Sequence, residues 1–184
     1  EGNLDAANAL VSWGSTFERA MKGINIPDKM FAAMKRGYIR GATDGGALKE
    51  VIAICEAEGS YRFMRVQKED NEVRVLFRLL PQEGVNYHEW ILESNDEGEI
   101  HAVDVYFYVG GALVSQMTRP QLLPTIAHEK KNLLEKLIGP ESDYVRHFDD
   151  LMKMYDANRV RQDPQSVLDI YSQLPESLKK DRAV

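Results

Sequence analysis

The chain has a single cysteine, Cys55, among 184 residues, which excludes an internal disulfide and any metal site built from several thiolates. It also lacks an apolar run of about 18 residues, the length that a membrane span needs. The longest candidate, 102–114, is interrupted by Asp104 and two glycines. Lys and Arg number 23 against 29 Asp and Glu. This net charge of −6 argues against nucleic acid as the main partner, because basic side chains supply most of that affinity.

The motifs of phosphate binding and hydrolysis are incomplete. Residues 41–46 have the glycine spacing of a phosphate loop, but Ala47 occupies the position where that loop requires lysine. Ser115 lies outside the G-x-S-x-G pattern of hydrolases, and His128 has no second histidine four residues later. The four histidines show no metal-ligand spacing. We therefore expect no metal site, no cofactor and no assembled catalytic constellation.

Apolar residues recur at three- and four-residue steps through the first third of the chain. This pattern predicts one helix over 4–21, a second that opens at Pro27, and a third over about 47–57. Cys55 falls on the apolar side of the third helix, which favours a small buried hydrophobic residue over a nucleophile.

After Gly59 the apolar period changes to two, which predicts β-strands. Four runs follow, with short polar separators between them. Short loops cannot make parallel crossovers, so we expect a four-stranded antiparallel meander. The predicted strands are 60–67, 72–80, 85–94 and 99–109.

The last third is helical again, which makes the whole an α+β fold. Apolar periodicity predicts helices over 122–137 and 144–155, and Asp163-Pro164 is a typical helix start. We place a domain boundary at Gly139-Pro140. The two expected domains are an α+β domain, 1–139, and a helical extension, 140–184.

Side chains alternate faces along a strand, so separators of four residues determine which side chains share a face. The expected core face carries Met64, Val66, Val73, Val75, Phe77, Leu79, His88, Trp90, Leu92, Val103, Val105 and Phe107. The expected second face carries Tyr61, Arg65, Arg74, Arg78, Tyr87, Glu89, Ile91, Asp104, Tyr106 and Tyr108. A single β-bulge would move residues to the opposite face.

In this register Arg78 lies opposite Tyr87, Tyr87 opposite Tyr106, and Glu89 opposite Asp104. Three interpretations of the second face stay open: a solvated face, a surface covered by helices or a partner protein, or a catalytic carboxylate pair. His88 is either a general base in an apolar cavity or a core histidine whose ring nitrogens are satisfied.

A family resemblance is carried by the segments Lys35–Gly41, Phe77–Leu80, Gly84–Trp90, Val103–Tyr108 and Val160–Lys180. These segments resemble an uncharacterised group of bacterial proteins. In that group a cystatin-like, or nuclear-transport-factor-two-like, α+β domain precedes helices of the tetratricopeptide type. The last part of the chain is similar to the second half of one tetratricopeptide unit, whereas stable arrays need about three units.

The resemblance implies a cystatin-like cone, in which a curved sheet wraps around a helix, followed by a helical extension suited to binding other proteins. It implies no particular chemistry, since the fold hosts both enzymes and binding modules. Relatives of this type tend to be exported. A chain that starts at Glu1 without methionine resembles a processed one, which favours a periplasmic or secreted location.

Our leading hypothesis from the sequence is a non-catalytic protein-interaction or scaffold module that binds another protein. The alternative is a small-molecule-binding domain or enzyme with His88, Asp104 and Tyr87 at the mouth of the cone. That alternative requires a pocket of several hundred cubic ångströms with convergent polar groups. A homodimer built through the sheet is a third possibility. The candidate binding residues are Arg78, Tyr87, His88, Asp104 and Tyr106.

Overall fold

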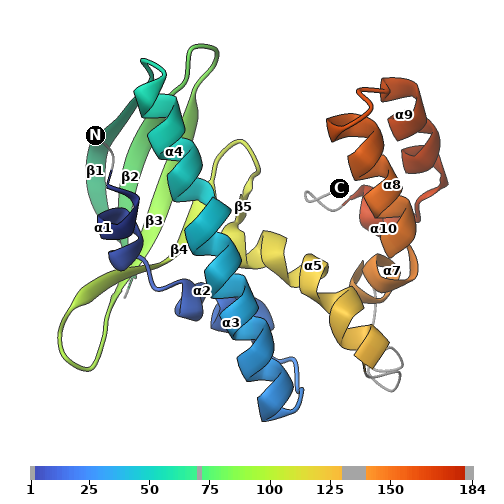
Figure 1. Cartoon of the computed structure of the whole chain (residues 1–184), viewed down its shortest axis with the longest axis horizontal. Coiled ribbons are helices and arrows are strands. Elements are labelled where there is room, and N and C mark those ends of the chain that lie inside the picture. The colour runs from blue at the N-terminus through green and yellow to red at the C-terminus, as the bar shows by residue number, and fades with distance from the viewer. Residues whose placement is uncertain (1–2, 70–71, 130–139, 181–184) are drawn as a thin grey trace. The chain divides into compact units, whose positions relative to one another are not determined.

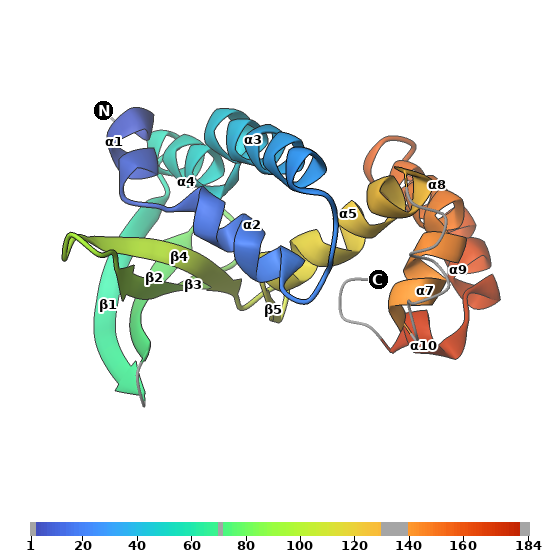
Figure 2. The same ribbon diagram turned by 90° about the horizontal axis from the view of Figure 1, so that it is seen from below.

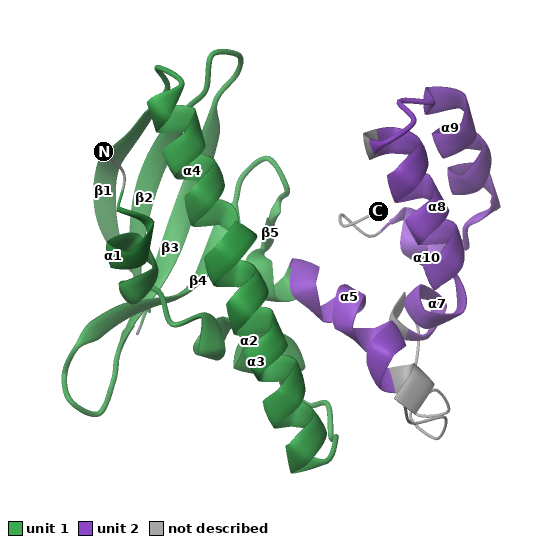
Figure 3. Ribbon diagram, viewed as in Figure 1, with its two compact units in different colours: residues 1–116 green, residues 117–184 purple. Residues whose placement is uncertain are grey.

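A computed structural model describes residues 3–69, 72–129 and 140–180 (Figure 1). Its contacts divide the chain into two compact units, Glu1–Gln116 and Met117–Val184, called unit 1 and unit 2 below (Figure 3). The boundary expected at Gly139-Pro140 borders on residues outside the described ranges and stays a prediction.

The described part of unit 1 contains the helices α1 to α4, followed by an antiparallel meander sheet in the order β1-β2-β3-β4-β5. This confirms an α+β fold with N-terminal helices packed on a meander. The fifth strand was not predicted, since two residues are too few to show alternation. The elements are α1 (Leu4–Ala9), α2 (Trp13–Met21), α3 (Asp28–Gly45), α4 (Ala47–Glu56), β1 (Ser60–Glu69), β2 (Glu72–Leu80), β3 (Asn86–Ser94), β4 (Ile100–Phe107) and β5 (Ala112–Leu113).

The single helix predicted over 4–21 is wrong, because α1 and α2 are separated at residues 10–12. The amide of Ala102 in β4 donates to the Leu10 carbonyl at 2.9 Å, and the Ser12 amide donates to the Ala102 carbonyl at 2.8 Å. Val11 thereby forms an isolated parallel bridge with Ala102. The chain leaves the helical conformation here to satisfy backbone groups at the edge of β4.

The helices predicted to open at Pro27 and to span 47–57 are confirmed as α3, which Pro27 caps, and α4. The prediction that Cys55 is buried is wrong, because its side chain is exposed near the end of α4. The reason is that Cys55 borders a cavity, described below, instead of packed side chains.

A β-bulge in β1 changes the predicted face of Tyr61. Phe63 pairs with Phe77, whereas Arg65 pairs with Leu76, so Met64 is an extra residue in the strand. Tyr61 therefore shares the helix-covered face with Phe77, and its assignment to the second face is wrong.

The register between β3 and β4 also differs from the prediction. Tyr106 lies opposite Glu89 and Asp104 lies opposite Ile91, so the expected pairs of Tyr87 with Tyr106 and of Glu89 with Asp104 are wrong. The observed register differs from the predicted one by two residues. One residue arises because the turn between β3 and β4 has five residues instead of the four predicted, and the other arises from a bulge after Ile91. Because the two shifts add to two, these side chains keep their predicted faces.

The core of unit 1 lies between the sheet and the helices. Figure 2 shows α1, α2, α3 and α4 on one side of the sheet. Apolar burial against these helices is the main force that stabilises the unit. The buried cluster consists of Val11, Trp13, Leu48, Trp90, Ala102 and Val105.

The described part of unit 2 contains most of α5 (Val114–Glu129) and four further helices, of which α8 and α9 pack together. The helix predicted over 144–155 is two helices, interrupted at His147, whose backbone (φ −106°, ψ 17°) departs from helical values. The start at Asp163-Pro164 is confirmed, since Asp163 accepts a hydrogen bond from the Ser166 amide. The helix expected over 122–137 begins earlier, and its part beyond 129 lies outside the described residues. The other elements are α7 (Pro140–Arg146), α8 (Phe148–Arg159), α9 (Pro164–Gln173) and α10 (Glu176–Lys179).

Candidate functional site

A cavity of about 860 Å³ lies in unit 1 between α1, α4 and the sheet. Its lining is predominantly apolar. Two lining residues, Leu10 and Ile100, are 66% and 65% exposed, so the cavity opens to the surface beside them. Its walls include Ala7 and Val11, Val51 and Ile52, and Val75 and Leu92.

Tyr61 and Trp90 form a polar contact within the lining. The indole N–H of Trp90 donates to the phenol oxygen of Tyr61 at 2.7 Å. The Tyr61 ring stacks on Phe77 with centroids 4.7 Å apart and an interplanar angle of 9°. Trp90 also meets Trp13 edge to face, with centroids 6.5 Å apart. These contacts hold the phenol in one orientation against the cavity.

The Tyr61 hydroxyl has an unused hydrogen-bond donor. Because the indole of Trp90 can only donate, the Tyr61 oxygen is the acceptor in their bond. The hydroxyl hydrogen finds no acceptor among the described residues. Burial raises the pKa of Tyr61, against the opposing effect of the Trp90 hydrogen bond, so the phenol stays protonated at neutral pH.

The remaining polar lining residues are Asn3, Cys55 and Glu56, and all three are exposed. Glu56 is the one charged residue among the described lining residues, which include no Lys, Arg or His. The described lining therefore offers apolar surface and the half-buried donor of Tyr61, but no cation for an anionic ligand.

His88 lies on the helix-covered face, with its ring 4.5 Å from that of Phe107, but it does not line the cavity. The Asn86 amide nitrogen donates to Nε2 at 3.2 Å, because the Asn86 oxygen accepts two backbone N–H groups and orients the amide. The proton therefore sits on Nδ1, which has no partner among the described residues. Burial lowers the pKa of His88 to about 4, so the imidazole is neutral at pH 7.

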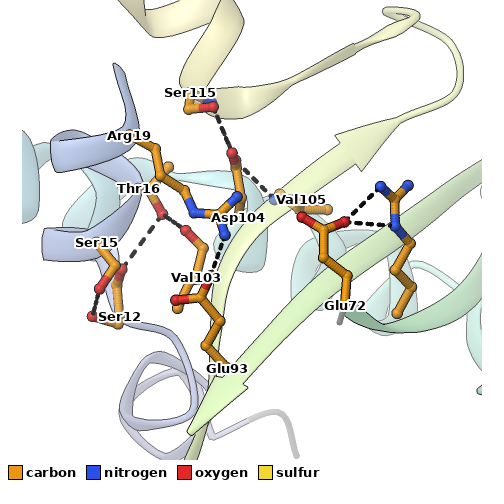
Figure 4. Close-up of polar contacts among 11 residues, drawn as sticks. Ser12, Ser15, Thr16, Arg19, Glu72, Glu93, Val103, Asp104, Val105 and Ser115 are labelled. Carbon is orange, nitrogen blue, oxygen red and sulfur yellow. Dashed lines mark hydrogen bonds and ion pairs between the residues drawn. The ribbon is translucent and has the colours of Figure 1, made fainter. Parts of the chain in front are cut away.

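Asp104 is a buried carboxylate, 1% exposed. It accepts hydrogen bonds from the Ser115 hydroxyl at 2.5 Å, the Ser115 amide at 3.1 Å and the Val105 amide at 2.9 Å (Figure 4). Burial raises the pKa of Asp104, and these hydrogen bonds oppose the rise. Every oxygen is thus engaged by the protein itself, which indicates a structural role.

Arg78, Tyr87 and Tyr106 lie on the sheet face opposite to α1, α2, α3 and α4. The predicted opposition of Arg78 and Tyr87 is confirmed, and Arg62 lies opposite Arg78 on the other side. Tyr106 packs edge to face on Tyr108, with centroids 5.2 Å apart. We call the following set the arginine–tyrosine face: Arg62, Arg65, Arg78, Tyr87, Tyr106 and Tyr108.

The five candidate residues from the sequence do not come together in one site. His88 lies on the helix-covered face, and the other four lie on the opposite face. Sequence reasoning missed Tyr61 because it took the alternation in β1 as continuous. A signal was present, since apolar residues occupy odd positions at Tyr61 and Phe63 but even positions at Met64 and Val66.

Within the described ranges, no group of three His, Cys, Asp or Glu residues is placed to hold a metal ion. No described helix has both the length and the apolarity that a membrane span requires. Comparisons of the chain with family models, with curated proteins and with solved structures found no match.

Proposed function

We propose that unit 1 is a binding domain that holds a small apolar molecule in the cavity between α1, α4 and the sheet. The observation that carries this proposal is a cavity of about 860 Å³ with a predominantly apolar lining. Pockets for small molecules commonly have volumes of about 300–1,000 Å³ and apolar walls. Displacing water from such walls favours binding in proportion to the apolar area covered.

The proposal is for binding without chemical conversion. Among the described lining residues the ionisable groups are Cys55, Glu56 and Tyr61. The two acid–base candidates from the sequence, His88 and Asp104, lie elsewhere, and both are engaged by hydrogen bonds within the protein. The nucleophile in the lining, Cys55, has no hydrogen bond to a base among the described residues, which supports a binding role.

The proposal includes a finer description of the fold. Unit 1 would be a cystatin-like, or nuclear-transport-factor-two-like, domain, and the helical extension 140–184 would resemble a single tetratricopeptide-like unit. Helices on one side of an antiparallel sheet with a cavity between them support the first part. The packed pair α8 and α9 supports the second.

The thiol of Cys55 tests this function, because it is exposed and lines the cavity. A bound molecule should cover it and slow its reaction with dithiobis(nitrobenzoate). With 4′-pentylacetophenone at about ten times its Kd, only about one protein in eleven is free, so the rate should fall about tenfold. Urea-unfolded protein is the control, since its thiol should react equally fast with and without the ketone.

Filling the cavity gives a matched pair of variants on α1. Ala7 lines the cavity and Ala9 does not, and Ala9 is exposed. Ala7→Phe should weaken binding of the ketone about tenfold or more, whereas Ala9→Phe should leave it unchanged. Equal affinities in both variants, together with an unprotected thiol, would contradict the proposal.

A second candidate function, protein binding, is favoured by the arginine–tyrosine face. Arg62 and Arg78 lie directly opposite each other, and neither has an ion pair among the described residues. Like charges in this position repel, and a carboxylate-rich partner would relieve the repulsion. Arginine and tyrosine are also the residues enriched where protein partners bind most strongly.

An acidic peptide tests this second candidate. A decamer of glutamate should bind the protein at low salt, and Arg78→Ala or Tyr106→Ala should weaken that binding about fivefold or more. Arg36→Ala, an exposed change on α3, is the control. If the Arg36 and Arg78 variants lose the same affinity, only net charge matters and the face is not a site. A doubled mass in light scattering would instead indicate a homodimer.

A further inference from the structure

We infer that Tyr61 is the polar anchor of the cavity, so that the preferred ligand is an apolar molecule with one uncharged oxygen acceptor, such as a ketone or an ester. This inference rests on the proposed function of unit 1 and names the ligand class. It depends on the contacts of a single hydroxyl group and on the charges around it.

The phenol of Tyr61 is held in one orientation. Stacking on Phe77 fixes the ring, and the Trp90 indole N–H occupies one lone pair of the oxygen. A phenol carries one donor and two acceptor positions, so the Tyr61 hydrogen remains available. The described part of the chain supplies no acceptor for it. An oxygen atom of a ligand in the cavity would accept the hydrogen bond that the Tyr61 hydroxyl can still donate.

The described lining residues include no cation. A carboxylate ligand near Tyr61 would lose its hydration without gaining a counter-ion, which is costly in an apolar site. Glu56, the charged residue among the described lining residues, would repel it further. An uncharged carbonyl oxygen accepts the same hydrogen bond without either cost.

A matched series of three ligands tests the inference by isothermal titration calorimetry on the full chain. Pentylbenzene, 4′-pentylacetophenone and 4-pentylbenzoate share one apolar body and differ in a hydrogen, an acetyl group or a carboxylate. The ketone should bind about fivefold tighter than the hydrocarbon, the gain expected from one hydrogen bond. The carboxylate should bind more weakly than the hydrocarbon.

Tyr61→Phe should bind the ketone no more tightly than pentylbenzene, and binding of pentylbenzene to the variant shows that it retains the cavity. Tyr108→Phe, a change on the opposite sheet face, is the matched control and should keep the wild-type preference. Should Tyr61→Phe fail to fold, the preference of the wild-type protein among the three ligands decides the question.

The outcomes separate this inference from the proposed function. If none of the three ligands binds and Cys55 stays reactive, the proposed function fails and the inference with it. If pentylbenzene and the ketone bind equally well to the wild-type protein and to Tyr61→Phe, the cavity binds ligands but Tyr61 is no anchor. Tightest binding of the carboxylate would overturn the uncharged ligand class.

Discussion

At the scale of single residues, Asp104 shows how unit 1 accommodates a buried negative charge. Three donors, the Ser115 hydroxyl and two backbone amides, surround its carboxylate. Hydrogen bonds from fixed donors replace the water that the carboxylate loses on burial. The donors in turn depend on the carboxylate, because each of them would be buried without an acceptor in its absence.

Asp104→Ala should therefore destabilise the protein by about 3 kcal/mol, since it leaves three donors without an acceptor. Asp104→Asn should cost much less, because its amide oxygen can accept both backbone bonds and its NH₂ group can donate to the Ser115 oxygen. Urea unfolding at pH 7 measures both free energies. Equal losses for the two variants would contradict this account of the contact.

His88 makes the stability of unit 1 depend on pH. Its pKa is lowered from 6.5 to about 4 by burial, so the unfolded chain binds the proton more readily than the folded chain. The stabilising contribution of the neutral imidazole is thus present above pH 6.5 and is lost as the pH falls toward 4.

Between pH 7 and pH 5 the wild-type protein should lose about 2 kcal/mol more unfolding free energy than His88→Phe, which has no imidazole to protonate. Carboxylates titrate equally in both proteins, so the difference isolates His88. Urea unfolding at the two pH values gives the four free energies. A pH dependence that is the same in both proteins would show that His88 does not titrate in this range.

At the scale of elements, the residues between α1 and α2 connect the wall of the cavity to the sheet by backbone hydrogen bonds. Residues 10–12 bond to Ala102 on the edge of β4, and both Leu10 and Val11 line the cavity. The Ser12 amide is one of the two donors in this contact. The position of α1 over the sheet therefore depends on backbone hydrogen bonds as well as on apolar packing.

Ser12→Pro and Ser12→Ala separate the backbone contact from the side chain. Proline removes the amide that donates to Ala102, whereas alanine keeps it. Ser12→Pro should be about 1–3 kcal/mol less stable than Ser12→Ala in urea, and the Ala102 amide should exchange its hydrogen faster. Equal stability and equal exchange would show that the contact contributes nothing.

The sequence predicted those elements whose signals are local. Pro27 and Asp163 mark helix starts through their own backbone and side-chain chemistry, and short polar turns require an antiparallel meander. The features that were missed depend on contacts distant in the chain. The break at Val11 exists because Ala102, 91 residues later, offers backbone partners.

At the scale of the whole molecule, the two units carry different reporters. The chain has two tryptophans, Trp13 and Trp90, and both lie in unit 1. Unit 2 is helical in its described part, and its cluster of Tyr144, Leu174 and Leu178 belongs to unit 2 alone. Tryptophan fluorescence therefore follows unit 1, whereas far-ultraviolet circular dichroism follows both units.

Leu178→Ala should shift the dichroism transition to lower urea and leave the fluorescence midpoint unchanged. The side chain is fully buried in unit 2, and such a truncation costs about 2–5 kcal/mol. Val105→Ala, a buried change in unit 1, should instead move the fluorescence midpoint. If Leu178→Ala moves both midpoints equally, the two units unfold as one cooperative body.

The candidate site was less predictable than the fold. A cavity is space that side chains leave unfilled, and neither composition nor periodicity reports such space. The sequence placed the ligand groups at His88, Asp104 and Tyr87, whereas the structure leaves the free donor of Tyr61 beside apolar walls. The expected and observed sites differ because the extra residue Met64 turns Tyr61 to the helix-covered face, and because α1 lies over the sheet so that a cavity remains between them.

Met64, the extra residue of β1, makes ligand binding depend on the length of that strand. A homologue with β1 one residue shorter before Arg65 would turn the counterpart of Tyr61 outward, away from its indole neighbour and from the pocket. Two proteins with high overall identity would then differ in ligand capacity, whereas distant relatives that keep the extra residue would share it. An insertion or deletion at this point is thus a better marker of shared binding than the percentage of matching residues.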